Sequence, residues 1–206
     1  DGTLEIVAYS GNDTMLTVPE AVEGKRVTRI GGYAFSGNGS LEGIVLPGGI
    51  TEIGDCAFWG CGSLKEIAIP ESVSKIPRGM LKGCQKLSAA VIPEGVTEIG
   101  YDAFEGCSSL SQVVIPDSVK QIGHEAFTNT AWLESQPEGV VYAGKIAYAY
   151  KGVRDSLTAV DIPEGICGIA DQAFKGCKSL AEVEISSTVQ YIGKEAFGNC
   201  HSLEDI

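Results

Sequence analysis

The cysteines are the residues whose chemistry and spacing stand out first. Seven occur among 206 residues, an odd number, so at least one has no partner within the chain. Five of them each stand three residues after a phenylalanine or a leucine: Cys61, Cys84, Cys107, Cys177 and Cys200. Cys56 and Cys167 lie outside this register, and we expect them to be the more exposed thiols. Thiols in a regular series could bind metal, form disulfides or act as nucleophiles.

The surroundings of the five cysteines favour a structural role instead. No Cys-x-x-Cys pair occurs, and His124 and His201 are isolated, so zinc-ligand spacing is missing. Asn38 and Thr130 occupy the same position elsewhere, which indicates a small side chain able to form hydrogen bonds. Stacked neighbours could come within disulfide distance, but parallel side chains in register point poorly toward one another. We therefore expect reduced, buried thiols.

Other catalytic patterns are missing from the sequence. It contains no Gly-x-Gly-x-x-Gly, no P-loop and no Gly-x-Ser-x-Gly. Carboxylates such as Glu52, Glu66 and Glu98 recur along the chain, as is typical of a solvated face. We predict that the protein is not an enzyme and has no metal site and no cofactor.

The overall charge excludes two classes of partner. The chain has 27 acidic and 15 basic residues, a net charge of −12. Such a surface repels nucleic-acid phosphates and anionic lipid headgroups. No apolar stretch is long enough to span a bilayer. We expect no nucleic-acid partner and no direct membrane insertion.

An internal repeat of 23 residues must position these side chains. All six phenylalanines fall in one series with gaps of 23, 46, 23, 47 and 23, and Leu81 fills the first long gap: Phe35, Phe58, Phe104, Phe127, Phe174 and Phe197. Within a unit, Leu64-x-x-Ile67-x-Ile69 predicts a short strand that ends at Pro70. The Ala57-Phe58 step predicts one short helical turn. In the third unit Pro77 replaces the opening glycine, consistent with a first helical position.

A second signal lies two residues after each residue of this series. Only glycine or asparagine occurs there: Gly37, Gly60, Gly83, Gly106, Asn129, Gly176 and Asn199. These two residue types adopt the left-handed region most readily. We therefore predict that each unit turns there, through a left-handed residue that ends the helical turn.

The repeat Gly-x-x-Ala-Phe-x-Gly-Cys-x-Ser-Leu, complete from Gly100 to Leu110, resembles the BspA-like leucine-rich-repeat family of bacterial surface proteins. The resemblance implies an α/β fold, a right-handed leucine-rich-repeat solenoid with a parallel sheet and one short helical turn per 23-residue coil. We expect a single solenoid over 1–206. It comprises an N-terminal cap (1–30), regular repeats (31–127), a degenerate coil with a β-hairpin insertion (128–157) and regular repeats with the last one truncated (158–206).

The hairpin provides a first candidate binding site. The segment Gly139–Tyr150 has two β-rich runs about an Ala143-Gly144 turn. Aromatic residues gather in and near it: Trp132, Tyr142, Tyr148 and Tyr150. They could form a recognition surface. The alternative, which we favour, is that cross-strand aromatic pairs simply stabilise the hairpin.

The strand positions expected to face outward provide a second candidate. Just before the last apolar residue of each strand stand Val45, Ala68, Val91 and Val114, followed later by Asp161 and Glu184. An outward direction would give an apolar stripe in the first half and an acidic one in the second. Contiguous apolar surface often marks a binding site. Simple β-propensity explains the valines equally well.

The family resemblance implies an extracellular or cell-surface module that adheres to a host or microbial macromolecule, either protein or glycan. The alternative is a structural spacer in a larger surface protein. The chain starts at Asp1 without a leader and stops within a repeat at Ile206. We therefore expect a removed signal peptide, and either further sequence in the native gene or self-association through the last coil.

Overall fold

A computed structural model describes residues 2–204 and divides them into two compact units. Unit 1 comprises residues 2–118 and 125–135, and unit 2 comprises 119–124 and 136–204. The predicted self-association through the last coil depends on Ile206, which lies outside the described residues.

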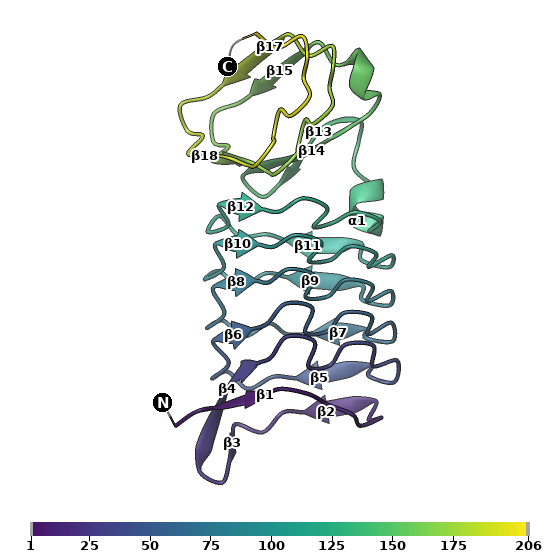
Figure 1. The fold of residues 1–206 in the computed structure, drawn as a ribbon, viewed down its shortest axis with the longest axis vertical. Coiled ribbons are helices and arrows are strands. Elements are labelled where there is room, and N and C mark those ends of the chain that lie inside the picture. Colours follow the sequence, from purple (N-terminus) through teal and green to yellow (C-terminus); the bar gives the residue numbers. More distant parts are fainter. Residues whose placement is uncertain (1, 205–206) are drawn as a thin grey trace. The chain divides into compact units, whose positions relative to one another are not determined.

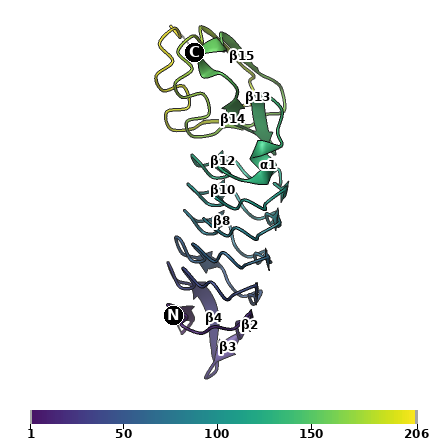
Figure 2. The same ribbon diagram turned by 90° about the vertical axis from the view of Figure 1, so that its right-hand side faces the viewer.

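Unit 1 is a stack of coils whose short strands pair in parallel with those of neighbouring coils (Figures 1 and 2). One column contains β2 (Met15–Thr17), β5 (Gly43–Val45), β7 (Glu66–Ile67), β9 (Ala89–Val91) and β11 (Gln112–Val114). The other contains β1 (Leu4–Ile6), β4 (Lys25–Ile30), β6 (Glu52–Ile53), β8 (Lys75–Ile76) and β10 (Glu98–Ile99), with β3 (Ala21–Val22) antiparallel to β4. The pairing of Val91 with Val114 shows the 23-residue register.

The segment around each phenylalanine is a ladder of turns and not the helical turn that the sequence predicts. In the Phe35 coil, alternate amides donate to the next coil, for example Phe35 to the Ala57 carbonyl at 2.8 Å. The amides between them donate to carbonyls three residues earlier, as Ser36 does to Tyr33 at 3.0 Å. The helix prediction is wrong. Among the described residues the only helices are α1 (Ala131–Glu134) and the 3-10 helix η1 (Arg154–Ser156).

Left-handed residues explain why no helix forms. The predicted glycine and asparagine positions all have positive φ, between 58° and 78°. A second left-handed residue, which the sequence does not indicate, stands two residues before each phenylalanine or Leu81, with φ between 53° and 61°: Tyr33, Cys56, Gly79, Asp102, Glu125, Gln172 and Glu195. A right-handed helix cannot run through residues of the opposite hand. The three residues between them therefore form turns, and the fold is a β-solenoid with almost no helix.

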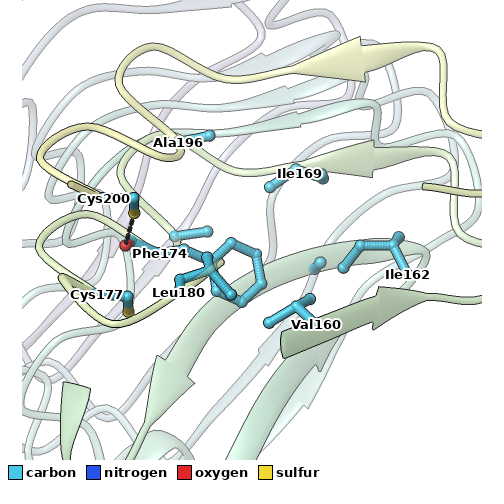
Figure 3. Close-up of a cluster of buried hydrophobic side chains, with 10 residues drawn as sticks. Val160, Ile162, Ile169, Phe174, Cys177, Leu180, Ala196 and Cys200 are labelled. Carbon is cyan, nitrogen blue, oxygen red and sulfur yellow. Dashed lines mark hydrogen bonds between the residues drawn. The ribbon is translucent and has the colours of Figure 1, made fainter. Parts of the chain in front are cut away.

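The phenylalanines form the predicted spine of the core. Phe35 stacks on Phe58 with ring centroids 5.1 Å apart, and Phe104 stacks on Phe127 at 5.3 Å. Leu81 is fully buried at the corresponding position of its own coil. In unit 2, Phe174 lies among Val160, Ile162, Ile169 and Leu180 (Figure 3). Burial of one large ring per coil is what a 23-residue unit cannot achieve without neighbours.

Unit 2 contains the predicted hairpin. Strands β13 (Gly139–Ala143) and β14 (Ile146–Lys151) are antiparallel, and Gly144 has a φ of 60°, as expected for its turn. The remaining strands of unit 2 are β12 (Gln121–Ile122), β15 (Ala159–Ile162), β16 (Gly168–Ile169), β17 (Glu182–Ile185) and β18 (Tyr191–Ile192). The sheet order is β13-β14-β16-β18, and β15 pairs in parallel with β17.

Both strand columns of unit 1 are interrupted between the Phe58 coil (54–76) and the Leu81 coil (77–99). Within residues 2–204, β6 does not pair with β8 and β7 does not pair with β9. The turn ladder continues across the same level, since the Cys56 amide donates to the Arg78 carbonyl at 2.8 Å. The two coils are therefore joined mainly through their turns and their core.

Pro77 accounts for this interruption. A Cβ on Gly54 would lie 2.4 Å from the Gly32 nitrogen, so the opening glycine lets successive coils approach closely. The Gly54 amide also donates to the Ile30 carbonyl at 2.7 Å, and Gly100 repeats both features. Pro77 brings a ring into this space and has no N–H to donate. It acts as a spacer between two coils rather than as the first residue of a helical turn.

Candidate functional site

The strand positions that were expected to face outward do face solvent in unit 1. Val45, Val91 and Val114 are 53%, 66% and 57% exposed, and Ala68 is exposed as well. Their neighbours Ile44 and Ala90 point into the core because side chains alternate along a strand. These four residues of unit 1 form a continuous apolar stripe, which we call the apolar face.

Met15 extends the apolar face, although the sequence analysis did not single it out. Met15 is 60% exposed and lies on β2, opposite Gly43 of β5. Its thioether occupies the space that a side chain at position 43 would need, because a Cβ there would lie 2.7 Å from the Met15 sulfur. The sequence signal for this contact was Gly43, since the same strand position in other coils is occupied by Glu66, Ala89 or Gln112.

A hollow of about 710 Å³ lies within the apolar face. It forms where β7 and β9 are unpaired, with the small side chain of Ala68 between Val45 and Val91. Charged residues also line it: Lys65, Glu66 and Glu71. An apolar floor with a charged rim is the usual composition of a site for a macromolecular partner.

The corresponding strand positions of unit 2 are acidic. Asp161 of β15 lies opposite Glu184 of β17, and both side chains are exposed. Glu182 continues this face beside Ala159. Like charges directly opposite one another destabilise a sheet, so packing alone does not favour this pair.

The aromatic residues near the hairpin are largely packed against neighbouring side chains. Tyr148 is only 4% exposed, and Tyr142 and Tyr150 pack partly buried against the core of unit 2. Tyr150 lies opposite Val140 across the hairpin. Trp132 belongs to unit 1, where it is half-buried with its ring centroid 5.1 Å from that of Phe127. These placements favour the stabilising role of the aromatic residues.

In the described part of the chain, four of the five cysteines of the series, all except Cys177, donate to a carbonyl of the preceding coil. The thiols of Cys61, Cys107 and Cys200 lie 3.0, 3.0 and 3.2 Å from the carbonyl oxygens of Phe35, Leu81 and Phe174, the last shown in Figure 3. All seven cysteines are free. Burial raises the pKa of Cys61 to about 11 and that of Cys107 to about 12. Neutral thiols are poor nucleophiles and poor metal ligands, so these residues are structural.

The two cysteines outside the series differ from one another. Cys56 is half-buried, in line with the expectation of a more accessible thiol. Cys167 is buried, with its sulfur 3.9 Å from the Val119 carbonyl oxygen, so the expectation of an exposed thiol is wrong there. The residue belongs to the coil that follows the hairpin, where the repeat spacing changes.

One acidic cluster has the donor types of a cation site. Oxygens of Asp102, Glu105 and Glu125 lie within 4.8 Å of one another. The Lys82 ammonium pairs with Glu105 and lies 3.3 Å from an Asp102 oxygen. This lysine therefore offsets part of the negative charge of the cluster.

Short parallel strands, a buried phenylalanine spine and a turn ladder, repeated every 23 residues, define a leucine-rich-repeat solenoid. The profile of the BspA type leucine rich repeat region matches residues 14–134 and 146–206 in six copies. The chain therefore belongs to the BspA-type leucine-rich-repeat family. No curated protein sequence matches the chain significantly. No helix within residues 2–204 is long and apolar enough to cross a bilayer.

Solved structures share this fold. The leucine-rich-repeat protein TpLRR of T. pallidum is 30% identical with a TM-score of 0.67, over 99% of this chain and 84% of that one. A leucine-rich cell surface protein of Faecalibacterium prausnitzii is 23% identical with a TM-score of 0.56, over 100% and 78%. The pneumococcal vaccine antigen PcpA is 20% identical with a TM-score of 0.50, over 100% and 63%.

Proposed function

We propose that this protein is a non-catalytic adhesion module at a bacterial cell surface, and that its apolar face binds a protein on a host or microbial cell. The hollow between Val45 and Val91 carries the proposal. It provides a contiguous exposed apolar surface that neither the core nor the strand pairing requires. Family membership and the similarity to a leucine-rich cell surface protein of F. prausnitzii support the location.

The composition of the apolar face indicates what kind of partner fits. Met15 is unbranched and adaptable, so it can adjust to the contour of a protein ligand. Val91 and Val114 supply rigid apolar contacts, whereas Glu66 and Glu71 at the rim favour a partner with basic residues around an apolar anchor. The net charge of −12 strengthens this preference at long range.

A cell-binding assay tests the proposal. Fluorescently labelled protein is added to epithelial cells and to bacterial cells, and bound protein is measured by flow cytometry. Val91→Asp should reduce binding at least tenfold, because it places a charge in the middle of the apolar face. Val153→Asp is the matched control, since Val153 is 71% exposed but lies in unit 2.

A second arm of the assay determines whether the partner is a protein. Trypsin treatment of the target cells should abolish binding if the partner is a protein. Absent binding to both cell types, or equal binding by Val91→Asp and the parent, would instead support the role of a structural spacer.

A further inference from the structure

We propose a second binding site, for a neutral oligosaccharide, in the hollow that Pro77 opens on the other strand column of unit 1. This hollow has a volume of about 530 Å³, within the range of pockets that hold small ligands. It lies along β6, β8 and β10, whereas the apolar face lies along β5, β7, β9 and β11 (Figure 1). The site is independent of the protein partner proposed above.

Backbone groups left without partners by Pro77 form the floor of this site. Elsewhere in the column the Thr51 amide donates to the Thr28 carbonyl and the Thr97 amide to the Ser74 carbonyl, both at 2.9 Å. Within residues 2–204, no such bond joins the Ser74 amide to the Thr51 carbonyl.

Among the residues that the structure describes, the carbonyl of Ile53 also lacks the inter-coil hydrogen bond that its counterparts form. This carbonyl is the counterpart of the Ile30 carbonyl, which accepts from Gly54, but residue 77 is a proline and has no amide hydrogen. Thr51, Ile53 and Ser74 all line the hollow. They offer two acceptors and one donor that strand pairing uses in the other coils. Such groups require hydrogen-bonding partners, which water or a ligand can supply.

The side chains around this floor suit a sugar. Tyr101 is 42% exposed and lines the hollow, so its ring can stack against the C–H face of a pyranose. Asp55 and Glu52 offer carboxylate oxygens to sugar hydroxyls, and Arg78 offers donors. A hydroxyl both donates and accepts, so polyhydroxylated ligands satisfy such a mixed set.

The charges argue against an anionic ligand. Three carboxylates line the hollow, those of Glu52, Asp55 and Glu98, against two cations. Lys75 is already paired with Glu98 at 2.7 Å. Only Arg78 remains to attract a phosphate, sulfate or uronate, and Asp55 lines the same hollow. The ligand should therefore be uncharged.

Exposed aromatic residues extend the site along the turn ladder. Tyr33 and Trp59 are 57% and 46% exposed, with ring centroids 6.2 Å apart in an edge-to-face arrangement. The Tyr33 amide donates to the carbonyl of Asp55, which lines the hollow. A chain of several sugar units can thus contact Tyr101 in the hollow and the Tyr33–Trp59 pair beside it.

A glycan array of neutral and anionic oligosaccharides, followed by calorimetric titration of the best neutral ligand, tests this site. We expect binding of a neutral oligosaccharide, and Tyr101→Ala should weaken it at least tenfold. Pro77→Gly should also weaken binding at least tenfold, because glycine lets the two coils close and restores an amide for the Ile53 carbonyl. Circular dichroism melting establishes that each variant is folded.

Val91→Asp is the control on the apolar face, and it should bind the oligosaccharide as the parent does. Its loss of cell binding with intact glycan binding would separate the two sites. Absence of binding across the neutral glycans, a preference for sulfated or uronic glycans, or full affinity in both folded Tyr101→Ala and Pro77→Gly would overturn the proposal.

Discussion

The thiol of Cys84 donates to the carbonyl oxygen of Phe58 in the preceding coil, with sulfur and oxygen 3.3 Å apart. The same oxygen accepts the Cys61 amide at 3.2 Å, so one carbonyl joins the turn of its own coil to the next coil. Cys84 is fully buried, and burial strongly raises the pKa of its thiol. Other small donors occupy the same position: the Asn38 side chain donates to the Gly11 carbonyl at 3.0 Å, and the Thr130 hydroxyl donates to the Phe127 carbonyl of its own coil at 2.7 Å.

Native reactivity of the cysteines follows from this geometry. Titration with a small alkylating reagent at pH 7.5 should modify Cys56 first, while Cys61, Cys84 and Cys107 react only after denaturation. The reason is that the three thiols are fully buried and protonated, whereas Cys56 is half-buried. Mass spectrometry identifies the modified residues. Rapid labelling of Cys84 in the folded protein would contradict the structural role.

Alkaline pH should destabilise the protein through the same thiols. An unfolded cysteine loses its proton near pH 8.5, whereas folded Cys107 keeps it up to about pH 12. Above pH 8.5 the unfolded state therefore binds fewer protons than the native state, and the free energy of unfolding falls as pH rises. Urea unfolding between pH 7.5 and 10 measures this slope. Cys107→Thr, which introduces the residue type that Thr130 provides at the same position of another coil, should show a shallower decline than the parent.

The phenylalanine spine should control stability in unit 1. Phe104 is fully buried and stacks on Phe127, so Phe104→Ala leaves a cavity and should cost about 3–5 kcal/mol. Phe104→Leu should cost clearly less, because Leu81 fills the same position in its own coil. Chemical denaturation compares the two variants. A loss below about 1 kcal/mol for Phe104→Ala, typical of surface changes, would argue against a buried spine.

The interruption at Pro77 should be visible in amide exchange. Ser74 lacks the inter-coil bond that Thr51 and Thr97 make, so its amide should exchange faster than theirs. Pro77→Gly should slow exchange at Ser74 by letting the two coils pair. Hydrogen-exchange mass spectrometry of the peptides around these residues gives the readout. Equal protection of Ser74 and Thr97 in the parent would show that Pro77 does not separate the coils.

Much of this architecture can be predicted from the sequence because its causes are local and repeated. The 23-residue spacing of Phe58, Leu81 and Phe104 indicates the spine, since a unit of that length cannot bury a ring alone. Glycine or asparagine two residues later indicates a left-handed turn, and all seven such residues adopt it. The outward direction of Val91 and Val114 follows from the alternation of side chains along a strand.

The remaining features depend on contacts between neighbouring coils, which the sequence of one repeat does not show. Tyr33 and Gln172 adopt left-handed backbones although neither residue type favours them, because the amide of each donates to a carbonyl of the next coil in the turn ladder. The chain therefore forms a ladder of turns where the sequence predicts a helical turn. The sequence shows Pro77 at a glycine position, but only the close contact of stacked backbones makes that proline a spacer. The two hollows arise at this level for the same reason: they depend on the distance between coils, which no single repeat determines.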